Sequence, residues 1–401
     1  MKRPHLLAAV LAFAAFAGAL VAGELYADRV ERQYVHALAA AHFDQKNQGS
    51  VLQRAAFQEP DLLPIYGSSE LTIPNPYHGS EVFKEYPTGF TIFPVGKAGT
   101  TDLIILQDLA AAGELKGKKV AISLSAPWFF GKMQSPESYA GNFSALHAEA
   151  LAWDTQLPFA LKHEIALRLL DYPNTLTKEP LLHFALNQLA RGGTGNRLLY
   201  YASLPLGKLQ IAVLQLQDHW ETLKMIKAPQ KKLPAATPPV AGPVDWSRLL
   251  TQATTEQQQH ANNNPFGFDN QIWQSKLKNE TPKQPAKNRD LTWMQGMWQS
   301  KEWTDLDLLL RSLKAMGAEP IIFSMPIQGP YYDYTGVSAW ARQAYYTKLQ
   351  QVTRPYSVPV LMYADHDEDK YFLIDSGAHL SREGWIYYDK ALDQFYHGTL
   401  K

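Results

Sequence analysis

Alternating blocks of apolar and polar positions predict an α/β chain. Residues 62–66 and 118–125 are short apolar runs typical of buried strands, and residues 100–115 between them carry Leu and Ile at helical spacing. A strand, a helix and a strand in succession predict a parallel unit. Near the chain end we expect strands at 320–324 and 358–362, and helices at 304–317, 338–352 and 381–395. One parallel sheet flanked by helices, built from two separated parts of the chain, is therefore predicted.

The middle of the chain has a different pattern. Helical spacing around residues 160–170, 181–189 and 198–225 predicts an inserted helical subdomain. Five prolines follow between residues 229 and 243, and residues 251–270 are rich in Gln, Asn and Thr, which predicts a solvated linker. The expected segments are an anchor at 1–23, a membrane-proximal helix within 24–60, the first part of the α/β domain at 61–150, the helical insert at 151–227, the linker at 228–300 and the second part of the α/β domain at 301–401.

The first residues predict a membrane anchor. A run of 17 small and apolar residues covers positions 6–22 and follows Lys2 and Arg3. Its length is at the short end of what spans a bilayer and just above a signal-peptide core, so cleavage after Gly23 is the alternative. The basic flank predicts a cytoplasmic N-terminus and an extracytoplasmic remainder. We expect an uncleaved single-pass anchor, because of the flanking charges and the amphipathic continuation at residues 24–41. Residues 26–42 are the predicted membrane-proximal helix.

Composition narrows the possible functions. In this chain of 401 residues, 46% of positions are hydrophobic and 19% charged, as in ordinary globular proteins. The 38 Lys and Arg balance 38 Asp and Glu, which removes the positive field that nucleic-acid binding uses. The absence of Cys excludes disulfides and cysteine nucleophiles. The acidic run at 365–369 fits a solvated loop better than a cation site, and we expect no metal and no cofactor.

Ser69 is the candidate nucleophile. It follows the predicted strand in the turn Gly67-Ser68-Ser69-Glu70, where a hydroxyl is exposed at the carboxyl edge of the sheet. A serine that caps a helix fits the same local sequence. His379 and Asp375, on one predicted turn, could supply a base and the carboxylate that orients it. Gly99, in the glycine-containing stretch 95–101, could bring its N–H close to a developing oxyanion.

The order of these motifs resembles that of SGNH-type hydrolases and, more specifically, the DltD family of D-alanine transfer proteins. The matching segments are Gly67-Ser68-Ser69-Glu70, Trp128-Phe129, Gly317-Ala318, Ser324-Met325-Pro326-Ile327, Tyr331-Tyr332-Asp333-Tyr334-Thr335-Gly336, His379-Leu380 and Gly384-Trp385. The aromatic stretch is the most distinctive of them. Together they cover the anchor, roughly the first 130 residues and everything after Glu302.

The resemblance implies both a fold and a chemistry. The fold would be an SGNH-like or flavodoxin-like sheet, and the activity would be the transfer of D-alanyl groups to a teichoic-acid-like polymer outside the membrane. A membrane O-acyltransferase would pass on the activated alanine. Ser69 would act as nucleophile, His379 as base and Asp375 as orienting carboxylate. The acceptor or partner would contact Trp128, Tyr331, Tyr332, Asp333 and Tyr334.

Two positions depart from the SGNH pattern. The triad Asp usually lies three residues before the His, whereas Asp375 lies four before His379 and Ser376 takes the expected position. Residues 125–128 also lack the Asn that SGNH enzymes contribute to the oxyanion hole. Two other functions remain open: an esterase or thioesterase that releases acyl groups to water, and a tethered scaffold in which the aromatic stretch covers the core and Ser69 only caps a helix.

Overall fold

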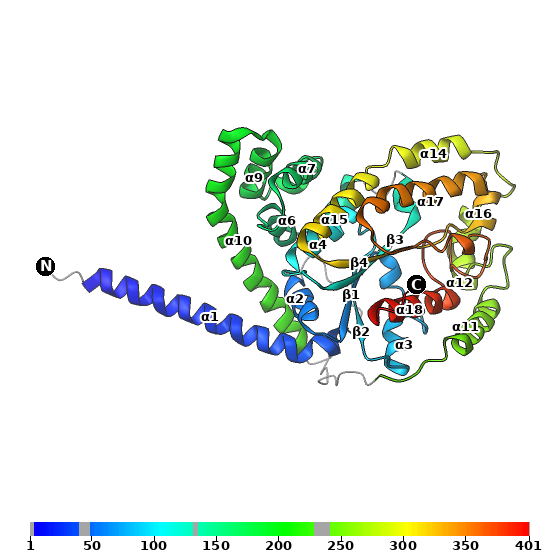
Figure 1. The fold of residues 1–401 in the computed structure, drawn as a ribbon, viewed down its shortest axis with the longest axis horizontal. Coiled ribbons are helices and arrows are strands. Elements are labelled where there is room, and N and C mark those ends of the chain that lie inside the picture. Colours follow the sequence, from blue (N-terminus) through cyan, green and yellow to red (C-terminus); the bar gives the residue numbers. More distant parts are fainter. Residues whose placement is uncertain (1–3, 40–48, 131–134, 228–240, 401) are drawn as a thin grey trace.

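Five parallel strands form the central sheet. The computed structural model describes residues 4–39, 49–130, 135–227 and 241–400. The strands are β1 (Leu62–Gly67), β2 (Thr91–Gly96), β3 (Lys119–Leu124), β4 (Glu319–Ser324) and β5 (Val360–Leu361), in the order β2-β1-β3-β4-β5. Two separated parts of the chain thus complete one sheet, as predicted (Figure 1). The strand order is that of flavodoxin-like folds, whose ligands bind where the winding reverses, between β1 and β3.

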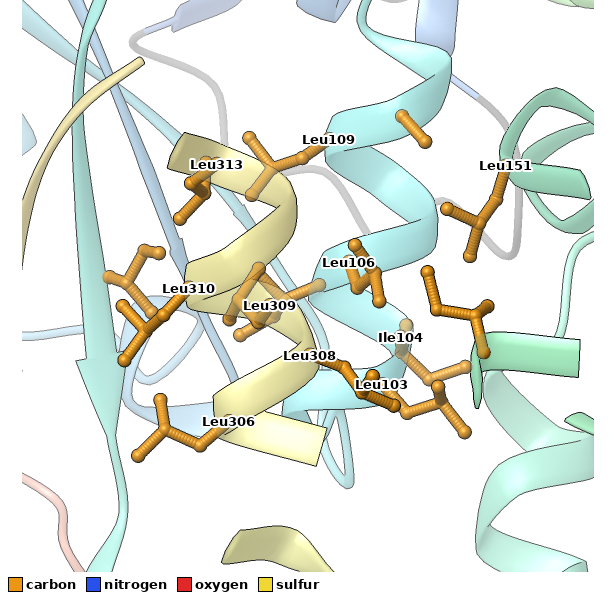
Figure 2. Close-up of a cluster of buried hydrophobic side chains, with 14 of the residues drawn as sticks. Leu103, Ile104, Leu106, Leu109, Leu151, Leu306, Leu308, Leu309, Leu310 and Leu313 are labelled. Atoms are coloured by element: carbon orange, nitrogen blue, oxygen red, sulfur yellow. The ribbon is translucent and has the colours of Figure 1, made fainter. Parts of the chain in front are cut away.

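Successive side chains alternate between the faces of the sheet and build two cores. On one face, Val120, Ile122 and Leu124 of β3 pack against α4 (Asp102–Ala111) and α15 (Glu302–Met316). Figure 2 shows the leucines of α4 and α15 lying between one another. On the other face, Ala121 joins the core formed with α3 (Gly79–Glu85) and α18 (Arg382–Tyr396). Because both faces are covered, the strands are apolar on both sides.

Four of the five strands were predicted and β2 was not. The predicted helices at 100–115, 304–317, 338–352 and 381–395 correspond to α4, α15, α17 (Ala339–Thr353) and α18. Strand β2 includes Pro94, which is tolerated because β2 lies at the sheet edge and pairs on one side only. β5 is shorter than the predicted strand at 358–362.

Along the chain, a group of helices follows β3 and precedes β4. They are η2 (Ala126–Phe130), α5 (Pro136–Asn142), α6 (Ala145–Ala152), α7 (Phe159–Leu169), α8 (Pro173–Leu176), α9 (Pro180–Arg191) and α10 (Gly193–Lys227). The long helix α10 runs back toward α1 (Pro4–Ala39) and α2 (Ser50–Gln58) and contacts both (Figure 1).

The predicted linker at 228–300 differs from the structure. Residues 228–240 lie outside the described residues, and the rest contains α11 (Trp246–His260), α12 (Asn270–Ile272), η3 (Trp273–Leu277), α13 (Lys278–Glu280) and α14 (Asp290–Trp298). Helix α11 packs against α18 and buries Leu249, Ala253 and Gln257 at a spacing of four residues. Only Leu249 and Ala253 of these buried residues are apolar, so the polar residues around them mask the helix in the sequence. The remaining short elements are η1 (Ser69–Leu71), α16 (Gly329–Tyr334), η4 (Arg354–Tyr356) and η5 (Ala364–His366).

Helix α1 is continuous from Pro4 to Ala39 and leads away from the rest of the molecule (Figure 1). Its last turns dock onto the domain, where Val35 and Leu38 are buried with Leu52 and Ala56 of α2. Lys2 and Arg3, which set the predicted orientation, lie outside the described residues, as do residues 40–42 of the predicted membrane-proximal helix. Within the described part of the chain, no helix combines the length and hydropathy that a membrane crossing requires.

Candidate active site

Ser69 is placed by two glycines at the carboxyl ends of β1 and β2. Strand β1 ends at Gly67, and Ser69 begins the short helix η1. A Cβ atom on Gly67 would lie 2.4 Å from Glu70 Oε1 and 3.1 Å from the Cβ of Ser123. Gly96, the register partner of Gly67, would bring a Cβ to 2.4 Å from the Gly67 carbonyl oxygen. The close approach of the strand ends therefore depends on the absence of side chains at both positions.

Ser69, His379 and Asp375 form a continuous chain of hydrogen bonds. Ser69 Oγ lies 2.8 Å from His379 Nε2. His379 Nδ1 lies 2.5 Å from Asp375 Oδ2. A carboxylate can only accept, so the proton is on Nδ1 and the Nε2 lone pair faces the serine hydroxyl in the neutral imidazole. Ser69 and His379 are 310 positions apart in the sequence, and the fold brings them together with Asp375 as a base-activated nucleophile requires.

A tight turn explains how Asp375 reaches His379 from four positions away. Leu373 and Leu380 pair as an antiparallel bridge, and the Ile374 N–H donates to the His379 carbonyl at 3.0 Å. Inside this turn the Gly377 N–H donates to Asp375 Oδ1 at 2.8 Å. One carboxylate oxygen therefore fixes the turn while the other accepts from the imidazole.

The electrostatic environment favours a protonatable base. Burial acts to lower the pKa of His379, but the hydrogen bond and the charge of Asp375 outweigh it, so the pKa lies above its ordinary value of 6.5. Burial raises the pKa of the neighbouring Glu70, whose Oε1 accepts from the Ser68 N–H at 2.7 Å. Glu70 thus holds the turn around the serine.

The predicted oxyanion donor, Gly99, contacts Ser68 in this structure. The Gly99 N–H donates to Ser68 Oγ at 3.0 Å, and Ser68 Oγ donates to the Lys97 carbonyl at 3.1 Å. Gly99 has a φ of 81°, which favours glycine. Asn142 of α5, which the sequence did not single out, supports this loop by donating from Nδ2 to the Ala98 carbonyl at 3.3 Å. Asn142 was not predicted because it lies on α5, many residues after the end of β3, where nothing in the sequence indicated a contact with this loop.

The predicted binding residues divide into two groups. Trp128 is only 3% exposed and belongs to the core beside α15, so it offers an acceptor little of its surface. Tyr331, Tyr332 and Tyr334 lie half-buried on α16. Tyr331 and Tyr334 each pack edge-on against Phe266 with ring centroids 5.3 Å apart. The aromatic stretch therefore covers a small core.

Tyr332 links this stretch to the turn that carries Asp375. Its hydroxyl donates to the carbonyl of Ser376, inside the Asp375 turn, at 3.4 Å. Asp333 is half-exposed and accepts from the buried Arg342 guanidinium at 2.7 Å. Arg342 also pairs with Glu368, whose side chain is 65% exposed, at 2.5 Å. The neighbouring Asp367 is 9% exposed and accepts from the Ile327 N–H at 2.9 Å, so part of the acidic run at 365–369 is buried and is not the solvated loop that was predicted.

Two other groups of His and acidic side chains in the described residues have ligand atoms within 4.8 Å of one another. They are Asp28, Glu31 and His219, and His36, Glu59 and Asp61. In each group the imidazole contacts a carboxylate directly. His219 Nδ1 lies 2.9 Å from Glu31 Oε1, and His36 Nε2 lies 2.8 Å from Asp61 Oδ1. Neither group contains a triad residue, and both join α1 to the domain.

Fold and site together define a class: an α/β protein of flavodoxin-like strand order with Ser, His and Asp hydrogen-bonded in series at the carboxyl edge of the sheet. The family model described as DltD protein matches residues 39–397. Protein DltD of Bacillus subtilis (strain 168) is 31% identical over 402 residues, which cover 99% of this chain and 98% of the relative. The chain therefore belongs to the DltD protein family.

Two more distant relatives carry the same name. Protein DltD of Staphylococcus aureus (strain NCTC 8325 / PS 47) is 26% identical over 356 residues, covering 88% of this chain and 86% of the relative. Protein DltD of Lacticaseibacillus rhamnosus is 23% identical over 351 residues, covering 88% and 81%. DltD proteins function in the D-alanylation of teichoic acids, a process of the cell envelope.

Proposed function

We propose that this chain transfers D-alanyl groups to a teichoic-acid-like polymer through an ester on Ser69. The observation that carries the proposal is the hydrogen-bond series from Ser69 Oγ through His379 to Asp375. It supports nucleophilic acyl transfer, because the alcohol is weak until a base takes its proton.

The proposed reaction has two symmetrical halves. His379 Nε2 accepts the Ser69 proton as Oγ attacks the acyl carbonyl, and the carrier group leaves with that proton. A polymer hydroxyl then gives its proton to His379 and attacks the Ser69 ester, after which Oγ recovers the proton. Asp375 holds the imidazole in the required tautomer and stabilises its positive charge. One ester bond forms on the polymer for each acyl group taken from the carrier.

Two backbone N–H groups are proposed to stabilise the oxyanion, those of Gly99 and Ser69. Gly99 lies on the loop that contacts Ser68, directly before the nucleophile. Its N–H would have to be shared between Ser68 Oγ and the oxyanion. Tyr332 is proposed to contact the acceptor, supported by its hydrogen bond into the Asp375 turn, with Tyr331, Asp333 and Tyr334 shaping the same side.

A single-pass anchor formed by the first part of α1 is proposed to hold the domain outside the membrane. The support is the apolar run at 6–22 together with its exposure, since Leu11, Phe16 and Val21 are 60%, 61% and 56% exposed on a helix that leads away from the domain (Figure 1). A membrane O-acyltransferase is the proposed donor partner. It would deliver the activated alanine to the same side.

Replacing Ser69 by Ala tests the proposal. The variant should abolish ester-linked alanine on the polymer in cells that have no other copy of the gene, and should abolish covalent labelling of the purified protein by a fluorophosphonate probe. Ser247→Ala, on the exposed face of α11, is the control and should change neither. Normal polymer alanylation by the Ser69→Ala variant would refute the acyl-serine.

A hydrolase would behave differently with the same protein. Rapid turnover of a simple ester without polymer, combined with normal polymer alanylation in Ser69→Ala cells, would favour an esterase. Normal alanylation with both Ser69 and His379 replaced, and no labelling of wild type, would favour a scaffold.

A further inference from the structure

Helix α10 exposes an apolar stripe along most of its length. One side of the helix, with Tyr200, Gly207 and Ile211, is buried, and the helix contacts α6 and α9. The opposite side leaves large apolar side chains exposed, and they are Leu198, Leu199, Tyr201, Leu206, Leu209, Val213 and Trp220. A continuous exposed apolar surface of this kind marks a contact with a partner or a membrane.

The stripe carries no negative charge over most of its length. Residues 193–217 contain no Asp or Glu, and their two basic residues, Arg197 and Lys208, are exposed. The next acidic residue, Asp218, is buried and accepts from the Gly49 N–H at 2.7 Å. An apolar helix face with basic and aromatic residues beside it is typical of helices that lie in a membrane interface, where the basic residues attract anionic lipid.

Buried contacts fix the position of α10 relative to α1. His219 of α10 pairs with Glu31 of α1, and both side chains are buried. Figure 1 shows that α10 rises from this contact along the flank of the domain that faces the free end of α1, with α6 and α9 behind it. The exposed side of α10 is turned away from α6 and α9. The stripe and the exposed apolar part of α1 therefore face the same side of the molecule.

The width of the stripe favours lipid over a partner helix. Leu206, Leu209 and Val213 follow one another at intervals of three and four residues, which would also fit a seam between two helices. The exposed apolar surface is wider than such a seam, since it extends from Tyr201 to Leu199 around roughly 160° of the helix. A lipid surface covers a stripe of this width, whereas one helix leaves its margins in water.

We propose that α10 lies on the lipid surface from which α1 emerges, with Leu206, Leu209 and Val213 below the level of the headgroups. The inference rests on the proposed anchor, because the anchor places that surface beside α10. The stripe alone gives only weak and reversible binding, so stable attachment depends on α1. A helix that crosses the membrane and a helix that lies on it together fix the tilt of the domain. Ser69 would then keep a constant direction relative to the membrane.

Spin labels on the full chain test the contact. The chain contains no Cys, so one introduced cysteine gives a single labelling site. Leu209→Cys on α10, Leu291→Cys on α14 and Leu11→Cys on α1 replace leucines that are 63%, 76% and 60% exposed. The chains are reconstituted in vesicles of phosphatidylglycerol and phosphatidylethanolamine. Electron paramagnetic resonance then measures how accessible each label is to oxygen, which dissolves in lipid, and to a water-soluble nickel chelate.

The Leu209 label should lie about 5–10 Å below the headgroup level and be more accessible to oxygen than to nickel. The Leu291 label is the matched control, because α14 lies on the far side of the domain from α1 and α10 (Figure 1), and it should be more accessible to nickel. A Leu209 label in water combined with a Leu11 label in lipid would overturn the contact and leave the anchor standing. A Leu209 label protected from both reagents would also overturn it, since protein and not lipid would then cover the stripe. A Leu11 label in water would refute the anchor, and the Leu209 label would still decide the contact by itself.

Charged substitutions give an independent check. Leu206→Glu together with Leu209→Glu should lower the ratio of oxygen to nickel accessibility of a label at Val213→Cys by at least about threefold, because carboxylates resist transfer into lipid. All three positions are exposed, so the fold should be kept. Leu291→Glu is the control and should leave the ratio unchanged. An unchanged ratio in the doubly substituted chain would contradict the contact.

Discussion

Asp375 shows how a single side chain can serve two structural tasks at the candidate active site. Its Oδ1 fixes the turn through Gly377, and its Oδ2 fixes the imidazole of His379. The extra residue between Asp and His is absorbed by that turn, so the spacing that departs from the SGNH pattern still gives a direct contact.

The raised pKa of His379 predicts a particular pH dependence. Labelling of Ser69 by a fluorophosphonate needs the neutral imidazole, so the rate should fall with decreasing pH through a midpoint above the ordinary value of 6.5. In Asp375→Asn the two largest causes that raise the pKa of His379 are gone, while burial and the smaller effect of the Glu70 charge remain, so the midpoint should move to lower pH. The measurement is the labelling rate of the purified chain from pH 5 to pH 9.

The same variant should also label more slowly at its optimum, by roughly 10²- to 10⁴-fold, because the tautomer is no longer fixed. Asp365→Asn, at an exposed position of η5, is the control and should leave rate and midpoint unchanged. An unshifted midpoint in Asp375→Asn would show that this carboxylate does not govern His379.

At the scale of elements, a buried ion pair joins the helical group to the sheet-covering helices. Arg168 of α7 contacts Asp305 of α15 through two hydrogen bonds of 2.8 and 3.0 Å, with side chains 6% and 1% exposed. Burial is the largest cause that raises the pKa of Asp102 nearby, and the negative charges of Glu302 and Asp305 raise it further. The Arg168 charge therefore stabilises a buried acidic neighbourhood.

Removing Arg168 should destabilise the fold strongly. Arg168→Leu leaves Asp305 buried without its partner, and the free energy of unfolding should fall by about 3–5 kcal/mol. Arg311→Leu is the control, since its pair with Glu164 joins the same two helices at the surface and should contribute at most about 1 kcal/mol. Chemical denaturation of both variants gives the comparison, and equal losses would contradict it.

At the scale of the molecule, α1 has two parts with different surroundings. The first carries exposed apolar side chains and leads away from the domain, while the second contributes Glu31, Val35 and Leu38 to buried contacts. The proposed anchor and the docking contact are thus joined in one continuous helix.

Two truncations should separate these parts. A chain beginning at residue 24 should lose membrane association and keep its thermal midpoint, because the docking residues remain. A chain beginning at residue 40 should unfold at a lower temperature, because it lacks Val35 and Leu38 and the apolar surface of α2 that they cover becomes exposed. Membrane fractionation and thermal unfolding of both chains are the measurements. Continued membrane association of the chain that begins at residue 24 would argue against the anchor.

Local sequence patterns determined much of this protein. Four strands, the main sheet-covering helices and the turn at Ser69 were predicted, because apolar periodicity and glycine positions depend on neighbours only a few residues away. The pairing of Asp375 and His379 on one predicted turn near the chain end made His379 the candidate base, and the family resemblance implied the same role. Roles at the site remain proposals.

Only the tertiary structure decided which distant residues meet. In the structure Trp128 lies in the core, and the Gly99 N–H donates to Ser68 Oγ. Helix α11 packs against α18, and His147 contacts Asp108. None of these contacts follows from local spacing, because each depends on how separate elements pack and on which polar groups packing deprives of water.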